Sequence, residues 1–490
     1  MWTMAPDRVS TLNPLRPTPC ALRLTPCALR LSPPMNKRAG TVSIISLGCA
    51  KNLVDSEYML GILESKGFNL TSEIDEAEFA VINTCGFLES AVEEAIDTIL
   101  ETVRLKKEGR LRKLVVAGCF VQRYGYKLAR EIPEVDGWLG TGEISRVAEA
   151  LGPNEADHPP FLISRPTFLA DDHFPRVQST PFYTAYLKIA EGCSHRCTYC
   201  IIPKLRGPFR SRPIPSLVRE VKKMADRGVK EVNLIAQDTS LYGKDLYGEP
   251  SLVELLEKLV HINGIQWIRL LYLHPNRVSD SLLDIMDAEE TICPYLDIPL
   301  QHVNQNLLTA MGRDPHTEAP EQLIERIRKR KREISIRTTL MVGFPGETEK
   351  MFEQVCRFVT TAQLDFLGVF AFSPEKGSHA ARLQPTVDTD TAQKRLGRVM
   401  TIQSKISKRL NAQKVGKVFP VLIEGPSPET ELLLAGRTAA MAPDVDMSVL
   451  INEGEGITGE IMPVRITEAH PYDLVGKIVS FDEGVRKPSR

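Results

Sequence analysis

Residues 188–200 read Lys-Ile-Ala-Glu-Gly-Cys-Ser-His-Arg-Cys-Thr-Tyr-Cys, an apolar strand candidate that runs into a loop rich in cysteine. The loop spaces its thiols as Cys193-x3-Cys197-x2-Cys200. Three thiolates satisfy three irons of a four-iron cluster, which normally takes four cysteines. Because no fourth cysteine follows nearby, the spacing indicates a cluster with one iron open to another ligand. Zinc is the alternative, although His195 is not at a usual spacing for completing a closed four-ligand site.

Strand and helix patterns alternate on both sides of this loop. The strand candidates are Tyr186–Ala190, Glu231–Ala236, Trp267–Leu273, Tyr295–Leu300, Ile336–Val342 and Phe366–Phe372. Strands that alternate with helices indicate a parallel sheet, so we expect a partial (β/α)6 barrel over residues 183–410, short of the eight units of a closed barrel. Active sites of such barrels lie at the carboxyl ends of the strands, where the cysteine loop falls.

A second α/β unit is predicted over residues 41–150. Three apolar strands there each run straight into a cysteine, namely Cys49, Cys85 and Cys119. The carboxyl ends of parallel strands meet at one sheet edge, so the three thiols can converge. A single such cysteine would be read as a small buried hydrophobe, but three at equivalent places favour a common site.

The remaining segments differ in composition. Residues 151–182 are rich in proline and predict a linker, residues 411–481 carry short strands between turn residues and predict a small all-β module, and residues 482–490 form a tail. Residues 1–40 predict a disordered extension with a tandem repeat at Thr18 and Thr25. A transit peptide is the alternative, but a start at Met35 is preferred, and Cys20 and Cys27 then need no function.

Composition excludes several classes of function. A net charge of −1 over 490 residues gives no overall bias toward nucleic acid or membrane, and no apolar run is long enough to span a bilayer. Ten cysteines are too sparse for a secreted disulfide scaffold. The cysteine spacing points instead to a metal site in a reducing compartment, so we expect a cytoplasmic protein without a membrane partner.

The Cys193 motif, with the aromatic Tyr199 before its last cysteine, resembles that of the radical S-adenosylmethionine (SAM) superfamily. The resemblance implies that the open iron is chelated by the amino and carboxylate groups of SAM. One electron then cleaves SAM to a 5′-deoxyadenosyl radical, while the protein orients the cofactor and excludes water.

A wider resemblance, over about residues 41–480, is to the methylthiotransferases. Its signatures are Ser46-Leu-Gly-Cys-Ala-Lys-Asn-Leu-Val-Asp-Ser-Glu57, Asn83-Thr-Cys-Gly-Phe87, and the central motif that continues to Arg206-Gly-Pro-Phe-Arg-Ser-Arg-Pro213. The resemblance implies that Cys49, Cys85 and Cys119 hold a second [4Fe-4S] cluster, whose open iron carries the sulfur to be inserted. It also implies a second SAM as methyl donor, a sulfur donor, a reductant such as flavodoxin or ferredoxin, and a TRAM-like carboxy-terminal domain that grips the substrate.

Two branches of this family differ in substrate. One methylthiolates an adenosine of transfer RNA, and the other methylthiolates the β-carbon of an aspartate in small-subunit ribosomal protein twelve. Three segments resemble the second branch, namely Leu47–Asp55, Tyr295–His302 and Gly436–Asp446, although Ala50 stands where proline is more usual. We therefore expect ribosomal protein twelve, free or in the ribosome, as the partner.

The charge of the carboxy-terminal module favours the same branch. Between residues 412 and 480 there are five basic and ten acidic residues. An RNA-gripping domain should be basic, whereas an acidic one suits a basic protein. A merely solvated acidic surface is the alternative.

Further expectations attach to other residues. Tyr199 in the cysteine motif, together with Gln237, His302 and Gly343 at or after strand ends, could line the cofactor pocket, while Arg210 and Arg212 could bind a carboxylate or shape the site. The charge run Arg326–Arg332 is interpreted as a solvated helix face, and Cys293 and Cys356 as structural. Two other functions stay open: a transfer RNA methylthiotransferase, and a non-catalytic iron–sulfur or RNA-binding protein of translation.

Overall fold

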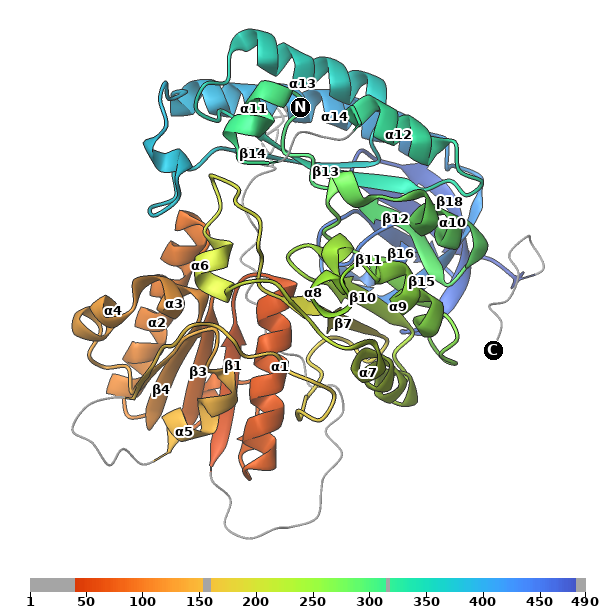
Figure 1. Cartoon of the computed structure of the whole chain (residues 1–490). Helices are drawn as coiled ribbons and strands as arrows, with labels where there is room; N and C mark the ends of the chain where they lie inside the picture. Colours follow the sequence, from red (N-terminus) through yellow and green to blue (C-terminus); the bar gives the residue numbers. More distant parts are fainter. Residues whose placement is uncertain (1–39, 153–159, 314–317, 482–490) are drawn as a thin grey trace, which may run out of the picture.

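The computed structural model describes residues 40–152, 160–313 and 318–481. They form a parallel-sheet unit, a partial barrel and a small closed β barrel (Figure 1), which confirms the expected α/β fold class. The expectations for the amino-terminal extension up to residue 39 and for the tail from residue 482 lie outside the described residues, as does the part of the linker at 153–159.

The first unit is a six-stranded parallel sheet in the order β2-β1-β3-β4-β5-β6. Its central strands are apolar and buried because helices cover both faces, with α1 on one and α2 on the other. The elements are β1 (Thr41–Ser46), α1 (Ala50–Ser65), β2 (Asn69–Leu70), β3 (Phe79–Thr84), α2 (Glu89–Lys107), β4 (Lys113–Gly118), α3 (Cys119–Tyr124), α4 (Tyr126–Glu131), β5 (Gly137–Leu139), α5 (Val147–Leu151) and β6 (Phe161–Leu162).

The first sheet extends past residue 150 into the segment expected to be a linker. Phe161 of β6 pairs with Trp138 of β5 and adds a sixth strand. Further along, the segment packs closely on α1: a Cβ on Gly61 would lie 2.4 Å from the backbone of Pro175. Part of the expected linker therefore fixes the first unit against the second.

The second unit is a six-stranded parallel sheet in the order β14-β13-β12-β11-β10-β7, and its six main strands match the expected ones. A short antiparallel pair, β8 (Ala190–Glu191) and β9 (Arg210–Ser211), brackets the cysteine loop. The other elements are β7 (Thr184–Lys188), α6 (Ile202–Arg206), α7 (Ile214–Asp226), β10 (Glu231–Ile235), α8 (Lys244–Tyr247), α9 (Leu252–Leu259), β11 (Trp267–Leu270), α10 (Asp280–Ala288), β12 (Ile292–Asp297), α11 (Gln305–Ala310), α12 (Pro320–Arg328), β13 (Ser335–Val342), α13 (Glu349–Ala362), β14 (Phe366–Ala371) and α14 (Thr389–Ala412).

The third unit is a closed barrel in the order β15-β16-β17-β19-β18. Its strands are β15 (Val418–Ser427), β16 (Thr430–Thr438), β17 (Ser448–Glu453), β18 (Ile461–Ala469) and β19 (Asp473–Ile478). The expected all-β module is present; the apolar runs at 418–423, 431–434, 448–451 and 461–466 predict its first four strands but not β19. β19 closes the barrel by pairing with both β17 and β18.

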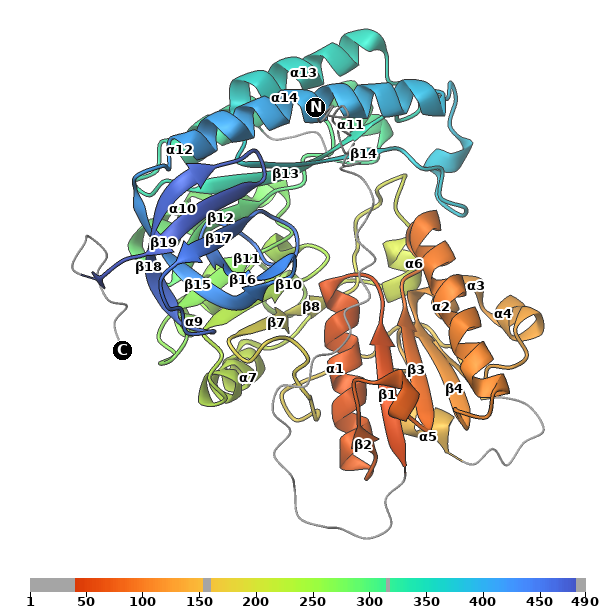
Figure 2. The ribbon, with the colours of Figure 1, turned by 180° about the vertical axis from the view of Figure 1, so that it is seen from behind.

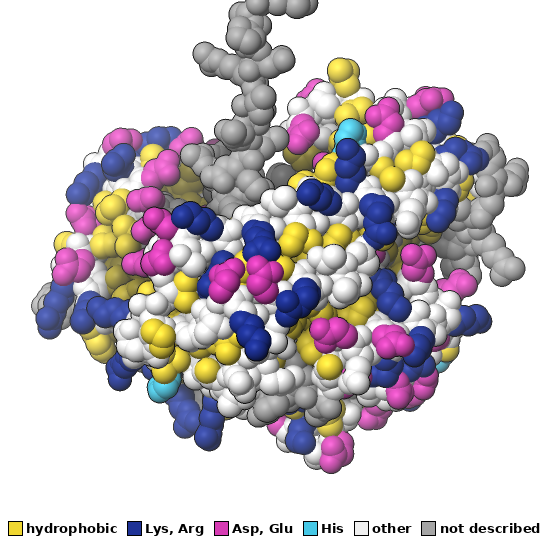
Figure 3. Space-filling view, turned by 90° about the horizontal axis from the view of Figure 1, so that it is seen from above, with side chains coloured by type: hydrophobic (Ala, Val, Ile, Leu, Met, Phe, Trp, Pro, Cys, Tyr) yellow, Lys and Arg dark blue, Asp and Glu magenta, His cyan; other side chains and the backbone are white. Residues whose placement is uncertain are grey.

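The small barrel covers the face of the second sheet that the helices leave free, and it lies behind that sheet in Figure 1 and in front in Figure 2. Tyr186, Trp267 and Tyr295 of the sheet share a core with Val421 and Val449 of the barrel. Seen from above, acidic and basic side chains are interspersed (Figure 3), in keeping with the small net charge. None of the described helices is long and apolar enough to cross a membrane.

Candidate functional site

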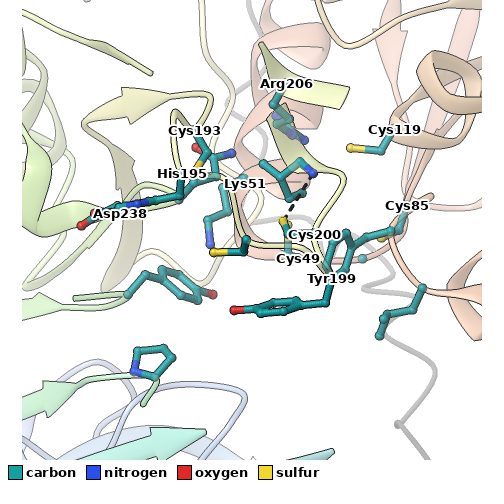
Figure 4. A pocket seen from close by; sticks show the side chains of 18 of the residues that line it. Cys49, Lys51, Cys85, Cys119, Cys193, His195, Tyr199, Cys200, Arg206 and Asp238 are labelled. Atoms are coloured by element: carbon teal, nitrogen blue, oxygen red, sulfur yellow. Dashed lines mark hydrogen bonds and ion pairs between the residues drawn. The ribbon is translucent and has the colours of Figure 1, made fainter. Parts of the chain in front are cut away.

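A cavity of about 650 Å³ lies between the first unit and the partial barrel. The carboxyl ends of strands in both sheets face it, and all six cysteines expected to bind clusters line its wall. Figure 4 labels Cys49, Cys85, Cys119, Cys193 and Cys200 there. The six cysteines thus line the same cavity, although Cys49 and Cys200 are 151 positions apart in the sequence. The two sets expected from spacing and strand position are brought together.

In the first set, each cysteine stands where a strand ends. Cys49 follows β1 and occupies the position before α1, Cys85 comes directly after β3, and Cys119 follows β4 as the first residue of α3. Helix amino termini carry a partial positive charge that favours a thiolate, so Cys49 and Cys119 are well placed as ligands. Gly48 has a φ of +94°, and a Cβ there would lie 2.7 Å from the Cβ of Cys85.

The second set lies in the loop between β8 and β9. The loop is held by backbone hydrogen bonds, Cys193 N to Gly207 O at 3.0 Å and Thr198 N to Met311 O at 2.7 Å. The backbone N–H of Ile202 donates to the sulfur of Cys200 at 3.4 Å. Hydrogen bonds of the protein itself therefore define the shape of the loop.

Burial favours the neutral form of four of the six thiols. It raises the pKa of Cys85 and Cys200 to about 12 and that of Cys119 and Cys193 to about 11. A bound cation would reverse this, because a coordinating thiol is deprotonated outright. Metal binding at these four cysteines would therefore be coupled to loss of their thiol protons.

The residues fit iron–sulfur clusters by donor chemistry and placement. All six sulfurs are free thiols at the wall of one cavity, three to a set.

Two expected cofactor residues line the cavity. The amide of Gln237 donates to Glu191 at 3.2 Å, while its oxygen Oε1 is buried without a partner. An unsatisfied buried acceptor at the cavity wall fits a ligand that carries a donor. The hydroxyl of Tyr199 accepts from Arg313 at 3.3 Å, and burial raises the pKa of Tyr199.

Sequence reasoning missed a histidine cluster beside the second set. His195 Nε2 lies 2.6 Å from Asp238 Oδ2, which also accepts from Arg277 at 2.8 Å. The ring of His274 stacks on that of His195 with 5.0 Å between centroids, and burial lowers the pKa of His274 to about 3. Asp238 and His274 follow the ends of β10 and β11, and this position at a strand end could have identified them as site residues. The same reasoning predicted only their neighbour Gln237.

Sequence reasoning also missed the buried polar residues that join the two units. Arg206 Nη1 lies 2.7 Å from Asp55 Oδ2 and 3.2 Å from Glu191 Oε2, and Lys188 contacts both carboxylates. Burial opposes the charge of Arg206, but the surrounding Cys119, Glu191 and Asp55 outweigh it and hold the pKa of Arg206 well above its usual range.

Asn52 links this network to the strand ends. Its side-chain amide donates to the carbonyls of Leu47 and Thr84, both at 3.0 Å, and its oxygen accepts from Arg206. The sulfur of Cys119 lies 3.8 Å from the same oxygen. Asn52 thereby fixes the loops that carry Cys49 and Cys85 relative to each other.

Lys51 reaches the cavity from the start of α1. Its side chain is buried, and Nζ stands 3.0 Å from the ring centroid of Tyr272. Burial lowers the pKa of Lys51 to about 8. Lys51 and Asn52 both belong to the signature after Cys49, but neither was selected from the sequence.

Three expected site residues do not line the cavity. Gly343 is required by packing, because a Cβ there would lie 2.5 Å from that of Ala392 in α14. His302 is fully buried and lies 3.2 Å from Glu347. Arg212 is fully buried and pairs with Glu220, so its guanidinium does not reach a cofactor carboxylate. The other role expected of Arg212, shaping the site, stays a prediction.

Four further expectations concern residues away from the cavity. Arg210 donates to the backbone carbonyls of Pro208 and Arg206 rather than to a carboxylate. In the charge run, Arg328, Lys329 and Lys331 are exposed, and Arg326 and Arg330 form surface ion pairs with exposed acids of α10, in keeping with the expected solvated face. Cys293 and Cys356 are buried in apolar cores, as expected of structural cysteines.

Comparison with known proteins assigns each unit. Residues 41–140 match the family described as Uncharacterized protein family UPF0004, residues 187–359 match the Radical SAM superfamily, and residues 415–479 match the TRAM domain. The radical SAM methyltransferase TsrM from Kitasatospora setae, solved with tryptophan and a SAM analogue, superposes with a TM-score of 0.51 at 16% identity over 68% of this chain and 73% of that one, which supports the fold. The chain is therefore a radical SAM protein, a class that uses a [4Fe-4S] cluster and SAM.

Relatives of the full length identify the family. The ribosomal protein uS12 methylthiotransferase RimO of Pelobacter propionicus is 45% identical over 89% of this chain and 97% of its own. That of Geotalea uraniireducens is 46% identical over 89% of this chain and 98% of its own. The chain belongs to the RimO family of radical SAM methylthiotransferases.

Proposed function

We propose that this chain inserts a methylthio group at the β-carbon of an aspartate of uS12, small-subunit ribosomal protein twelve, using SAM and two [4Fe-4S] clusters. The observation that carries the proposal is the shared cavity, because two sets of three cysteines from different units line it. One space gives a single substrate carbon access to both a radical source and a sulfur source. The names of the relatives support uS12 as the substrate.

Cys193, Cys197 and Cys200 would hold the cluster that binds SAM. They lie at the carboxyl ends of the barrel strands, where such barrels place their active sites. When bound, this cluster supplies the electron that cleaves SAM. Gln237 and Tyr199 line the same wall, and the unsatisfied oxygen of Gln237 offers SAM an acceptor.

Cys49, Cys85 and Cys119 would hold the second cluster, which the family resemblance makes the site of sulfur transfer. Two of the three lie at helix amino termini, and the paired guanidinium of Arg206 lies beside them, so the negative charge of thiolates there would be balanced. The side chain of Asn52 holds the loops in register. The chain's own residues thus orient the ligands and keep the site compact.

The small barrel would bind uS12 through its exposed acids. Not all ten acids are equally available: the side chain of Asp446 is internal and pairs with Arg337 at 2.5 Å, whereas Asp444 is exposed but accepts from the hydroxyl of Tyr186 at 2.9 Å. Glu431, Glu453 and Glu455 are exposed. An acidic surface attracts a basic protein and repels RNA, which favours uS12 over transfer RNA.

The remaining partners follow from the chemistry. SAM cleavage needs a one-electron reductant such as flavodoxin or ferredoxin, and the inserted sulfur needs a donor. Both needs, together with a ribosomal substrate, suit action in the cytoplasm.

The test is an anaerobic reaction of the cluster-loaded protein with SAM, reductant and sulfide, offered either uS12 or transfer RNA. Mass spectrometry should find the methylthio group on one aspartate of uS12. A methylthio group on transfer RNA alone would assign the chain to the other branch. Absence of 5′-deoxyadenosine from a fully loaded protein would favour a non-catalytic iron–sulfur protein.

A further inference from the structure

Lys51 differs from the other buried lysine of the site because, among the described residues, no carboxylate lies within ion-pair distance of it. Lys188 is paired with Asp55 and Glu191. Lys51 is 7% exposed, and among the described residues it has neither a hydrogen bond nor an ion pair. A buried ammonium is costly unless it is paired, so this arrangement calls for a ligand.

Within the described part of the chain, the short-range contact that the Lys51 ammonium makes is with an aromatic face. Its Nζ lies 3.0 Å from the ring centroid of Tyr272, a cation–π contact. Such a contact offsets part of the desolvation of the ammonium but leaves its N–H donors without acceptors. Those donors remain available to a ligand in the cavity that Lys51 lines.

The ring under Lys51 is held by a strained backbone. Tyr272 has a φ of +62°, which residues other than glycine rarely adopt. Its N–H donates to Asp297 Oδ2 at 3.0 Å, and its carbonyl accepts from Thr239 N at 3.0 Å. Strain of this kind persists where the surroundings fix it, and it is concentrated at binding sites. Asp297, whose charge favours the charged form of Lys51, also accepts this bond and lies 3.9 Å from Arg337, so its carboxylate is shared among several groups.

We infer that Lys51 binds a carboxylate of the protein substrate, the side chain that is to be modified. This inference rests on the proposed function, in which that side chain is an aspartate. Lys51 follows Cys49 by two residues and reaches over Tyr272, which comes from the barrel, so its ammonium lies between the two units. The substrate carbon must lie in this region to reach both cysteine sets. A charge-assisted hydrogen bond from Lys51 would orient the aspartate there.

The carboxylate of SAM is the other source of the same chemistry. SAM is expected at the Cys193 set on the barrel, whereas Lys51 belongs to α1 of the first unit. The substrate is therefore the favoured occupant, and the experiment distinguishes the two sources.

The experiment compares uS12 with a uS12 variant whose target aspartate is replaced by asparagine, which has the same shape without the charge. The cluster-loaded wild-type protein should have a kcat/KM about 30-fold or more higher for uS12 with aspartate than for the asparagine variant. The asparagine removes the negative partner of a buried charge pair, which is costly. Lys51→Gln should reduce this preference to within about threefold, and Lys51→Arg should keep most of it. Lys66→Gln, at the exposed end of α1, is the matched control and should keep the full preference.

Each outcome decides the inference. An aspartate preference retained in Lys51→Gln overturns it, and a rise in the KM for SAM with that preference retained places Lys51 on SAM instead. If the variant does not fold, equilibrium binding to the wild-type holoenzyme decides: aspartate-bearing uS12 should bind more tightly than the asparagine form, and equal affinities overturn the inference. A holoenzyme that gives no methylthiolated uS12 overturns the proposed function and this inference with it, whereas a working enzyme with unchanged preference in Lys51→Gln overturns this inference alone.

Discussion

The guanidinium of Arg206 lies 2.7 Å from the carboxylate of Asp55, and both side chains are almost fully buried. Arg206 ends α6, just after the cysteine loop of the barrel, while Asp55 lies in α1, just after Cys49. One ion pair therefore joins the two segments that carry the cysteine sets. Because Lys188 and Glu191 complete the network, the relative position of the two sets is fixed by buried charge.

Replacing Arg206 by glutamine should destabilise the protein and loosen the first cysteine set. The change leaves Asp55 and Glu191 with one cation, and breaking a buried pair costs about 3–5 kcal/mol. The urea midpoint should fall, and iron content after reconstitution should fall with it. Arg409→Gln, on the exposed side of α14, should change neither. An unchanged midpoint in Arg206→Gln would show that the network does not hold the units together.

Gly48→Ala should disturb the first set specifically. The new Cβ would lie 2.7 Å from that of Cys85, at a φ of +94°. Gly67→Ala is the matched control, because its φ is +87° and nothing lies within 4 Å. Both changes should cost about 1–2 kcal/mol through the left-handed backbone, but only Gly48→Ala should also reduce iron at the first set. Equal iron content in the two variants would contradict the contact with Cys85.

Acid should weaken the contact between the partial barrel and the small barrel. Glu231 is buried and lies 2.7 Å from Arg437 and 2.8 Å from Arg269. Burial opposes its charge, but the two arginines outweigh burial and lower the pKa of Glu231 to about 2. A carboxylate with a lowered pKa stabilises the fold above its usual value of 4.5, and that stability is lost as the pH falls from there toward about 2.

Urea midpoints measured against pH check this prediction. The midpoint should fall across that acidic window in the wild type, and in Glu257→Gln, an exposed glutamate of α9. Glu231→Gln should be less stable at neutral pH and should show a flatter decline. A decline of the same size in Glu231→Gln would assign the acid sensitivity to other groups.

Reversing exposed acids of the small barrel should weaken the binding of uS12. The change is Glu431, Glu453 and Glu455 to lysine, residues that are exposed; of these, Glu453 lies 3.7 Å from Lys477 within the small barrel. Affinity should fall, and its salt dependence should become weaker, since charges are screened beyond roughly 8 Å at physiological ionic strength. The same reversal at Glu93, Asp97 and Glu101 on α2 controls for net charge. Equal loss in both variants would remove the small barrel from substrate binding.

The sequence predicts the parts of the site that depend on local spacing. Cys193, Cys197 and Cys200 lie within one loop, and Cys49 stands at a strand end that its apolar pattern reveals. The sequence does not predict ion pairs between residues far apart in the chain, such as Asp55 and Lys188. A polar residue in a helix gives no local sign that it is buried. Asp446 shows the same limit: it counts as surface charge in the sequence but is internal in the fold.

The most direct test of the account is a comparison of two triple variants. Cys49, Cys85 and Cys119 are replaced by alanine in one, and Cys193, Cys197 and Cys200 in the other. Each should retain about four irons, against about eight in the wild type, since each set is expected to hold one four-iron cluster. The first variant should still cleave SAM to 5′-deoxyadenosine but leave uS12 without a methylthio group, whereas the second should not cleave SAM. Methylthiolated uS12 from the first variant, or SAM cleavage by the second, would contradict the division of roles between the two sets.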